Sequence, residues 1–144
     1  HKVCGILTEM SSDMDRIQYV IVGIGVNVNM TEFPEEIKET ATSLRLETGE
    51  VVRRAPLVAK MLFYFEHYYE LFLKTEDLSG LLADYNAHLV NKGKQVRIVE
   101  RTGEWTAIAE EMDEKGELVV TLPDGTKKNI ISGEVSVRGL YGYV

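Results

Sequence analysis

The hydrophobic pattern of this chain changes after Val90, and that change limits the folds the sequence can adopt. Before it, apolar side chains recur every three or four positions over residues 56–73, which predicts a long amphipathic helix. Asp77 suits the N-cap of a further helix whose apolar stripe runs to Leu89. After residue 91 turn residues separate short β-type runs, at 96–99, 105–110, 118–122, 129–131 and 135–137. The sequence therefore predicts an α+β chain, with one domain over residues 1–90 and a small five-stranded barrel over residues 91–144.

The first forty residues predict a β-hairpin followed by a short helix. Residues 2–9 and the β-branched run 17–28 are typical strands, and residues 11–15 form a polar turn between them. Pro34 suits the first turn of a helix, where Glu35 and Glu36 would lie at the positive end of its dipole. This pattern predicts a helix from about Pro34 to Thr40.

The second strand carries glycines and asparagines on one of its two faces. Side chains alternate between the faces of a strand, so the β-branched even positions from Val20 to Val28 form one face, fit to pack on a core. The odd positions form the other face, with Gly23, Gly25, Asn27 and Asn29. Glycine inside a strand often marks the close approach of a ligand or another backbone, and an amide offers both donor and acceptor atoms. Glycines covered by a crossing helix and asparagines that cap a turn are the structural alternative.

Lys2 is the cation nearest to this face in the predicted hairpin. Its ammonium group could point into the same pocket and attract a carboxylate or a phosphate. A solvated lysine at a frayed chain end is the alternative. The net charge of −7 argues against a general phosphate-backbone binder, so an anionic ligand would need such a locally placed cation.

Several other kinds of site are disfavoured by the sequence. The longest apolar run is too short to span a bilayer, and the single Cys4 cannot form an intramolecular disulfide, which fits a reducing, cytoplasmic setting. His1, His67 and His88 lie far apart, so no metal site is predicted. We find no Ser/His/Asp set and no paired carboxylates. The chain begins at His1 rather than Met and has no leader sequence, which predicts that it is a fragment.

Four segments of the chain, in order, resemble the C-terminal half of the biotin protein ligases. Residues 2–9 resemble the family's Lys-x-x-Gly-Ile-Leu-x-Glu strand, and residues 22–29 its Gly-x-Gly-x-Asn strand. Residues 33–36 with 41–44 are similar to the loop and helix that follow. Residues 132–139 resemble the terminal Gly-Glu-x-Ser-x-Arg motif. Each segment alone is a weak signal, whereas the four together cover nearly the whole chain.

The resemblance implies a fold and a two-step reaction. Residues 1–90 would complete a catalytic domain of the class II synthetase-like fold, and residues 91–144 would form the family's SH3-like barrel. The reaction joins biotin and ATP, with Mg²⁺, into biotinyl-5′-AMP. The biotinyl group then passes to a lysine of a biotin carboxyl carrier domain. A cytoplasmic location and a homodimer, formed through the central sheet as in some members of the family, are further expectations.

The resemblance also assigns roles to residues. Lys2 matches the family's catalytic, ligand-contacting lysine. The implied biotin and adenylate site comprises Lys2, Gly5, Gly23, Gly25 and Asn27. Glu134 and Arg138 match residues of the terminal barrel that the family uses for ATP and biotin; a surface ion pair is the alternative for them.

The chain also departs from the family pattern. The glycine- and arginine-rich loop that covers biotin and the adenylate is absent, as is the helix-turn-helix of the repressor members. We therefore expect the isolated chain to have little ligase activity and no nucleic-acid binding of its own. A non-catalytic interaction module and a lipoate-ligase-type acyltransferase remain as alternatives. A nucleic-acid-binding barrel is disfavoured, because residues 91–144 are slightly acidic and carry few aromatic side chains.

Overall fold

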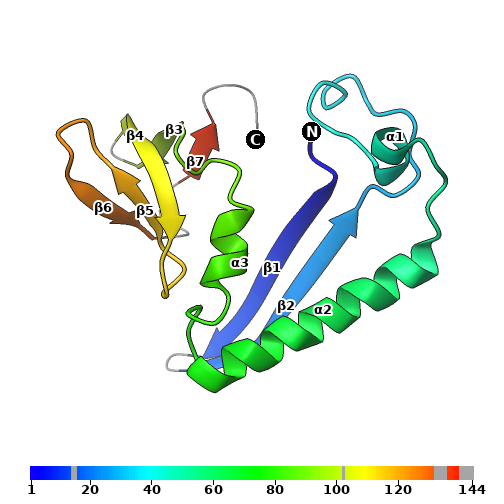
Figure 1. The fold of residues 1–144 in the computed structure, drawn as a ribbon, viewed down its shortest axis with the longest axis horizontal. Helices are drawn as coiled ribbons and strands as arrows, with labels where there is room; N and C mark the ends of the chain where they lie inside the picture. The colour runs from blue at the N-terminus through cyan, green and yellow to red at the C-terminus, as the bar shows by residue number, and fades with distance from the viewer. Residues whose placement is uncertain (14–15, 102, 132–135, 140–144) are drawn as a thin grey trace. The chain divides into compact units, whose positions relative to one another are not determined.

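A computed structural model of the chain describes residues 1–13, 16–101, 103–131 and 136–139 (Figure 1). The chain divides into two compact units, His1–Leu57 and Val58–Val144. The long helix α2, Arg54–Thr75, begins in the first unit and continues into the second. This division does not test the domain boundary predicted at residues 90/91, which stays a prediction. Among the described residues, no helix is both long enough and apolar enough to cross a membrane.

The first unit is built on an antiparallel hairpin of β1, Cys4–Asp13, and β2, Arg16–Val26. The predicted hairpin is thereby confirmed, although residues 11–13, predicted as part of the turn, belong to β1. Gly5 pairs with Gly25 and Leu7 pairs with Gly23, so these four residues share one face. The β-branched face does not pack on a core formed by the described residues, because Val22 and Ile24 remain 43% and 42% exposed.

The segment after β2 differs from its prediction. Residues 35–40 form consecutive turns instead of the predicted helix over Pro34–Thr40. The physical reason is that the end of this segment pairs with Lys2. The carbonyl of Thr40 accepts a hydrogen bond from the Lys2 N–H, and Ala41 forms an isolated β-bridge with Lys2. A short helix, α1, spans Leu44–Thr48; Ser43 caps its N-terminus, and Gly49 ends it with a φ of 77°.

The two predicted helices of the second half are present, with different limits. The periodic pattern over residues 56–73 is confirmed as α2, which is slightly longer. The next helix, α3, spans only Leu82–Ala87, and Leu81 rather than Asp77 is its N-cap. The Asp77 carboxylate instead accepts hydrogen bonds from the backbone N–H and the hydroxyl of Ser79, at 2.8 and 2.5 Å. These two hydrogen bonds lower the pKa of Asp77 and form a local turn that delays the helix.

The second unit contains the predicted five-stranded antiparallel sheet. Its strands are β3 (Gln95–Glu100), β4 (Gly103–Met112), β5 (Leu118–Thr121), β6 (Lys127–Ile130) and β7 (Ser136–Gly139), in the order β6-β5-β4-β3-β7. Alternate residues of these strands face inward and form the core of buried side chains. This core comprises Val96, Ile98, Ala107, Ala109, Leu118, Val120 and Ile130.

The segment from residue 78 to residue 94, here called the α3 segment, is hydrogen-bonded to the β4–β5 hairpin. The Asn86 side chain accepts from the Met112 N–H at 2.7 Å and donates to the Met112 carbonyl at 3.0 Å. The Leu78 N–H donates to the carbonyl of Glu114 at 2.9 Å. Leu89 packs against the core of the sheet. The α3 segment is therefore an integral part of the unit that contains the sheet.

Candidate functional site

Lys2 is held firmly by its backbone. Its N–H donates to the carbonyl of Thr40 at 2.7 Å, and its carbonyl accepts from the N–H of Thr42 at 3.0 Å. A parallel bridge to Ala41 accompanies these two bonds. The side chain is exposed, whereas the backbone is not that of a frayed chain end. The structure therefore anchors the backbone of Lys2, whereas its side chain stays exposed to solvent, and the role of its ammonium group stays a prediction.

The glycines of the hairpin form a bare patch, and Lys2 lies beside it. A Cβ placed on Gly5 would lie 3.7 Å from Cε of Lys2. On Gly25 it would lie 3.8 Å from the Gly5 carbonyl oxygen, and on Gly23 it would lie 3.6 Å from the Leu7 carbonyl oxygen. Apart from chain neighbours, no other described heavy atom would lie within 4 Å of these Cβ positions. This bare patch, Gly5, Gly23 and Gly25, is thus open backbone next to one flexible cationic side chain.

The two asparagines lie after β2, which ends at Val26, and not on the strand face where the sequence placed them, and their surroundings differ. Asn29 forms a pair of hydrogen bonds with the backbone of Val52, both at 2.9 Å, and so holds the loop before α2. Asn27 donates from its side chain to the Thr42 carbonyl at 3.0 Å. The Asn27 Oδ1 atom accepts no hydrogen bond from any residue in the described part of the chain. Asn27 can therefore accept a hydrogen bond from a ligand, whereas Asn29 has a structural role.

Thr42 and Ser43 connect Lys2 and Asn27 to α1. The sequence predicted a role in the site for neither residue. Thr42 is only 5% exposed, and its hydroxyl donates to Oε1 of Glu47 at 2.5 Å. Ser43 is fully buried, donates to the Met30 carbonyl and accepts from the first turn of α1. The sequence signal that could have pointed to them is a threonine and a serine directly before a Leu-x-Leu motif, which is typical of a helix N-terminus.

The two candidates at the end of the chain are only partly covered by the structure. Glu134 lies outside the described residues. The backbone of Arg138 lies in β7, paired with Arg97 of β3, and its side chain is not described. The structure therefore brings together Lys2, Gly5, Gly23, Gly25 and Asn27. The roles of Glu134 and Arg138 stay predictions from the sequence.

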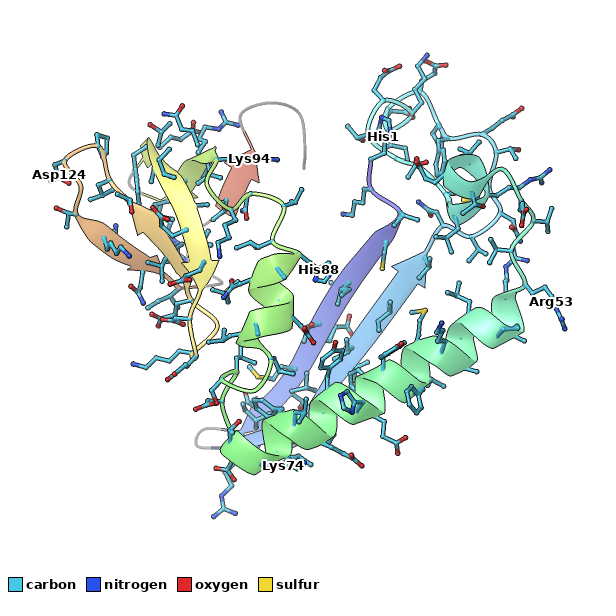
Figure 2. The ribbon with its side chains drawn as sticks, viewed as in Figure 1. His1, Arg53, Lys74, His88, Lys94 and Asp124 are labelled. Atoms are coloured by element: carbon cyan, nitrogen blue, oxygen red, sulfur yellow. The ribbon has the colours of Figure 1, made fainter. Side chains whose placement is uncertain are left out.

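The cavities that the structure describes in the second unit are lined by residues other than Lys2, Gly5, Gly23, Gly25 and Asn27. A groove of about 740 Å³ lies between α3 and the end of β4, lined among others by Asn86, Lys92 and Glu111. His88 marks the C-terminal end of α3 (Figure 2).

Lys128 lies 4.5 Å from the ring centre of Trp105 and so covers one face of that ring. In the part of the chain that the structure describes, no three His, Cys, Asp or Glu side chains are placed to bind a metal.

Comparison with known proteins agrees with this structure. Residues 93–138 match the model of the biotin protein ligase C-terminal domain. The bifunctional ligase/repressor BirA of Bacillus subtilis is 33% identical over 138 residues, which are 94% of this chain and 42% of the relative. This chain matches the C-terminal part of a biotin protein ligase. The corresponding BirA of Bacillus spizizenii gives the same identity and coverage.

Solved biotin protein ligase structures share the fold of this chain. The Aquifex aeolicus enzyme in complex with biotin and ATP has a TM-score of 0.78 and 31% identity, over 95% of this chain and 56% of that one. A single-residue variant of that enzyme with biotin has a TM-score of 0.81 and 32% identity, over 95% and 55%. The chain thus spans less than half the length of its curated relatives and about half the length of the solved ones.

Proposed function

We propose that this chain supplies the C-terminal part of the active site of a biotin protein ligase. Residues 1–90 complete a catalytic domain of the class II synthetase-like fold, and residues 91–144 form an SH3-like barrel. The solved relative with bound biotin and ATP and the five-stranded sheet of this chain support the proposal. In the proposed reaction the biotin carboxylate attacks the α-phosphorus of ATP and pyrophosphate leaves. The amine of a carrier-domain lysine then attacks the carbonyl carbon and AMP leaves.

The observation that carries the proposal is the position of Lys2 beside the bare patch. In the first step a carboxylate and a phosphate, both negative, must come together, and a fixed cation stabilises the charge that develops between them. The backbone of Lys2 is anchored on both sides, while its side chain reaches over Gly5. Without side chains at Gly5 and Gly25, a flat ligand can lie directly on the sheet.

The remaining residues have supporting roles in the proposal. Asn27 has a free Oδ1 acceptor that can orient the adenylate, and Gly23 extends the bare patch along β2. Glu134 and Arg138 act on ATP from the barrel. Mg²⁺ is proposed with ATP, and when bound it would neutralise phosphate charge. The described residues offer no set of three ligands for it, so we assign it no protein ligand and no step.

The partner of this proposal is a biotin carboxyl carrier domain. A homodimer through the sheet of the catalytic domain belongs to the same proposal, and the exposed apolar side chains of β1 and β2 are consistent with a larger sheet. We place the protein in the cytoplasm, where the free thiol of Cys4 would remain reduced.

A chimera tests the proposal. The part of the Aquifex aeolicus enzyme that precedes the matched region is joined to His1, and biotin transfer to a carrier domain is measured. We expect the chimera to transfer biotin. Replacement Lys2→Gln should lower kcat/KM by about 100-fold or more, as the loss of a charge-stabilising group does. Lys38→Gln is the matched control, because Lys38 forms a solvent-exposed pair with Glu35.

Two results would contradict the proposal. One is a folded chimera, with a cooperative thermal transition, that forms no biotinyl-5′-AMP. The other is a Lys2→Gln chimera that is as active as its Lys38→Gln counterpart.

A further inference from the structure

We propose that Thr42 is a positioning residue that holds Lys2 and Asn27 in register for the adenylate-forming step; this inference rests on the proposed function. Its backbone contacts both residues. The Thr42 N–H donates to the carbonyl of Lys2 at 3.0 Å, and the Thr42 carbonyl accepts from the Asn27 side chain at 3.0 Å. One peptide segment therefore links the proposed cation to the proposed ligand amide, although 25 positions separate these two in the sequence.

The side chain of Thr42 fixes this segment against α1. Its hydroxyl donates to the carboxylate of Glu47, and the residue is 5% exposed. The next residue, Ser43, is fully buried and donates to the Met30 carbonyl. A hydrogen bond from a hydroxyl to a carboxylate is stronger than one between two neutral groups, and removing the hydroxyl takes this donor from the Glu47 carboxylate.

Displacement of Thr42 would be transmitted to the site through these backbone bonds. Lys2 has no other backbone partners than Thr40 and Thr42 among the described residues. Without the Glu47 anchor the segment can shift, and Lys2 and Asn27 shift with it. Small misplacements of a group that stabilises a transition state cost up to about 100-fold in rate.

A double-mutant cycle in the chimera tests this role. Thr42→Val keeps the shape of the side chain and removes the hydrogen bond to Glu47. Its effect on kcat/KM for biotin activation is measured in the Lys2 protein and in the Lys2→Gln protein. Thr42→Ser restores the hydroxyl and is the rescue variant. Thr48→Val is the matched control, because the Thr48 hydroxyl bonds to the carbonyl of Leu44 within the same helix, α1.

We expect Thr42→Val to lower kcat/KM by about 10- to 100-fold when Lys2 is present and by a smaller factor in the Lys2→Gln protein, where only the displacement of Asn27 still acts. Thr42→Ser should recover most of the loss. A general folding defect would lower kcat/KM by the same factor in both proteins. An equal loss of kcat/KM in both proteins, or no loss in either, therefore overturns the positioning role of Thr42. A large effect of Lys2→Gln with no effect of Thr42→Val overturns this inference alone, whereas no effect of Lys2→Gln overturns the proposed function itself.

Discussion

Replacing Gly25 by alanine distinguishes a glycine required by the fold from one required by a ligand. A Cβ on Gly25 would lie 3.8 Å from the Gly5 carbonyl oxygen, an ordinary van der Waals distance, and Gly25 is not among the glycines with positive φ. Alanine therefore fits without strain. Because alanine has fewer unfolded conformations than glycine, we expect the free energy of unfolding to rise by about 0.5–1 kcal/mol.

The same methyl group would stand on the face where the proposed ligand lies. We expect binding of biotin and ATP by the chimera to weaken by about 10- to 200-fold, the range for one misplaced methyl-sized group in a binding site. Urea unfolding of the chain measures the first effect and calorimetric titration of the chimera measures the second. Gly80→Ala is the matched control, since its Cβ would also lie 3.8 Å from the nearest atom, a side-chain carbon of Leu71.

Two outcomes would refute this reasoning. A Gly25→Ala chain that unfolds more readily than the unchanged chain would show that the glycine serves the fold. A chimera that binds both ligands unchanged would show that no ligand lies on the bare patch.

Three further predictions concern the rest of the chain. Asn86→Ala should lower the free energy of unfolding by about 1–3 kcal/mol in urea titrations, because both backbone groups of Met112 lose their partner, whereas exposed Asn129→Ala should cost less than about 1 kcal/mol. The isolated chain should show no detectable biotin transfer to a carrier domain under conditions where the chimera is active. Since the pKa of Asp77 is depressed below its usual value of 3.8, its stabilising contribution should be present above pH 3.8 and be lost as pH falls through the lower, folded-state pKa. Carboxyl NMR titration should show that depressed pKa, and Ser79→Ala should move it back toward 3.8.

Strong periodic signals made much of the fold predictable. The apolar stripe of residues 56–73 predicted α2 correctly, because its spacing of three or four residues matches one face of a helix and can be recognised without knowing the tertiary contacts. The β-type runs after residue 91 gave the five strands, since each is bounded by its own turn residues. The glycine patch and Lys2 were also within reach, because alternation along a strand and the register of a simple hairpin place residues on a known face.

The predictions that failed were overridden by competing contacts, one between distant segments and one local. Pro34 and its glutamates favour a helix start, yet the bridge between Lys2 and Ala41 holds the following residues in turns. Asp77 is a good N-cap residue, but Ser79 offers it a nearer partner. The proposed role of Thr42 depends on its backbone bonds to Lys2 and Asn27, and a Thr-Ser pair before a helix start does not reveal those partners.

The bonds of the α3 segment determine where the polypeptide can be divided for use elsewhere. A piece that begins at residue 91 leaves Asn86 and Leu89 behind, so Met112 loses two hydrogen bonds and the sheet loses an apolar contact. A graft of this five-stranded sheet onto another protein should therefore carry the polypeptide from Leu78 onward, although the repeating strand pattern alone begins more than a dozen residues later.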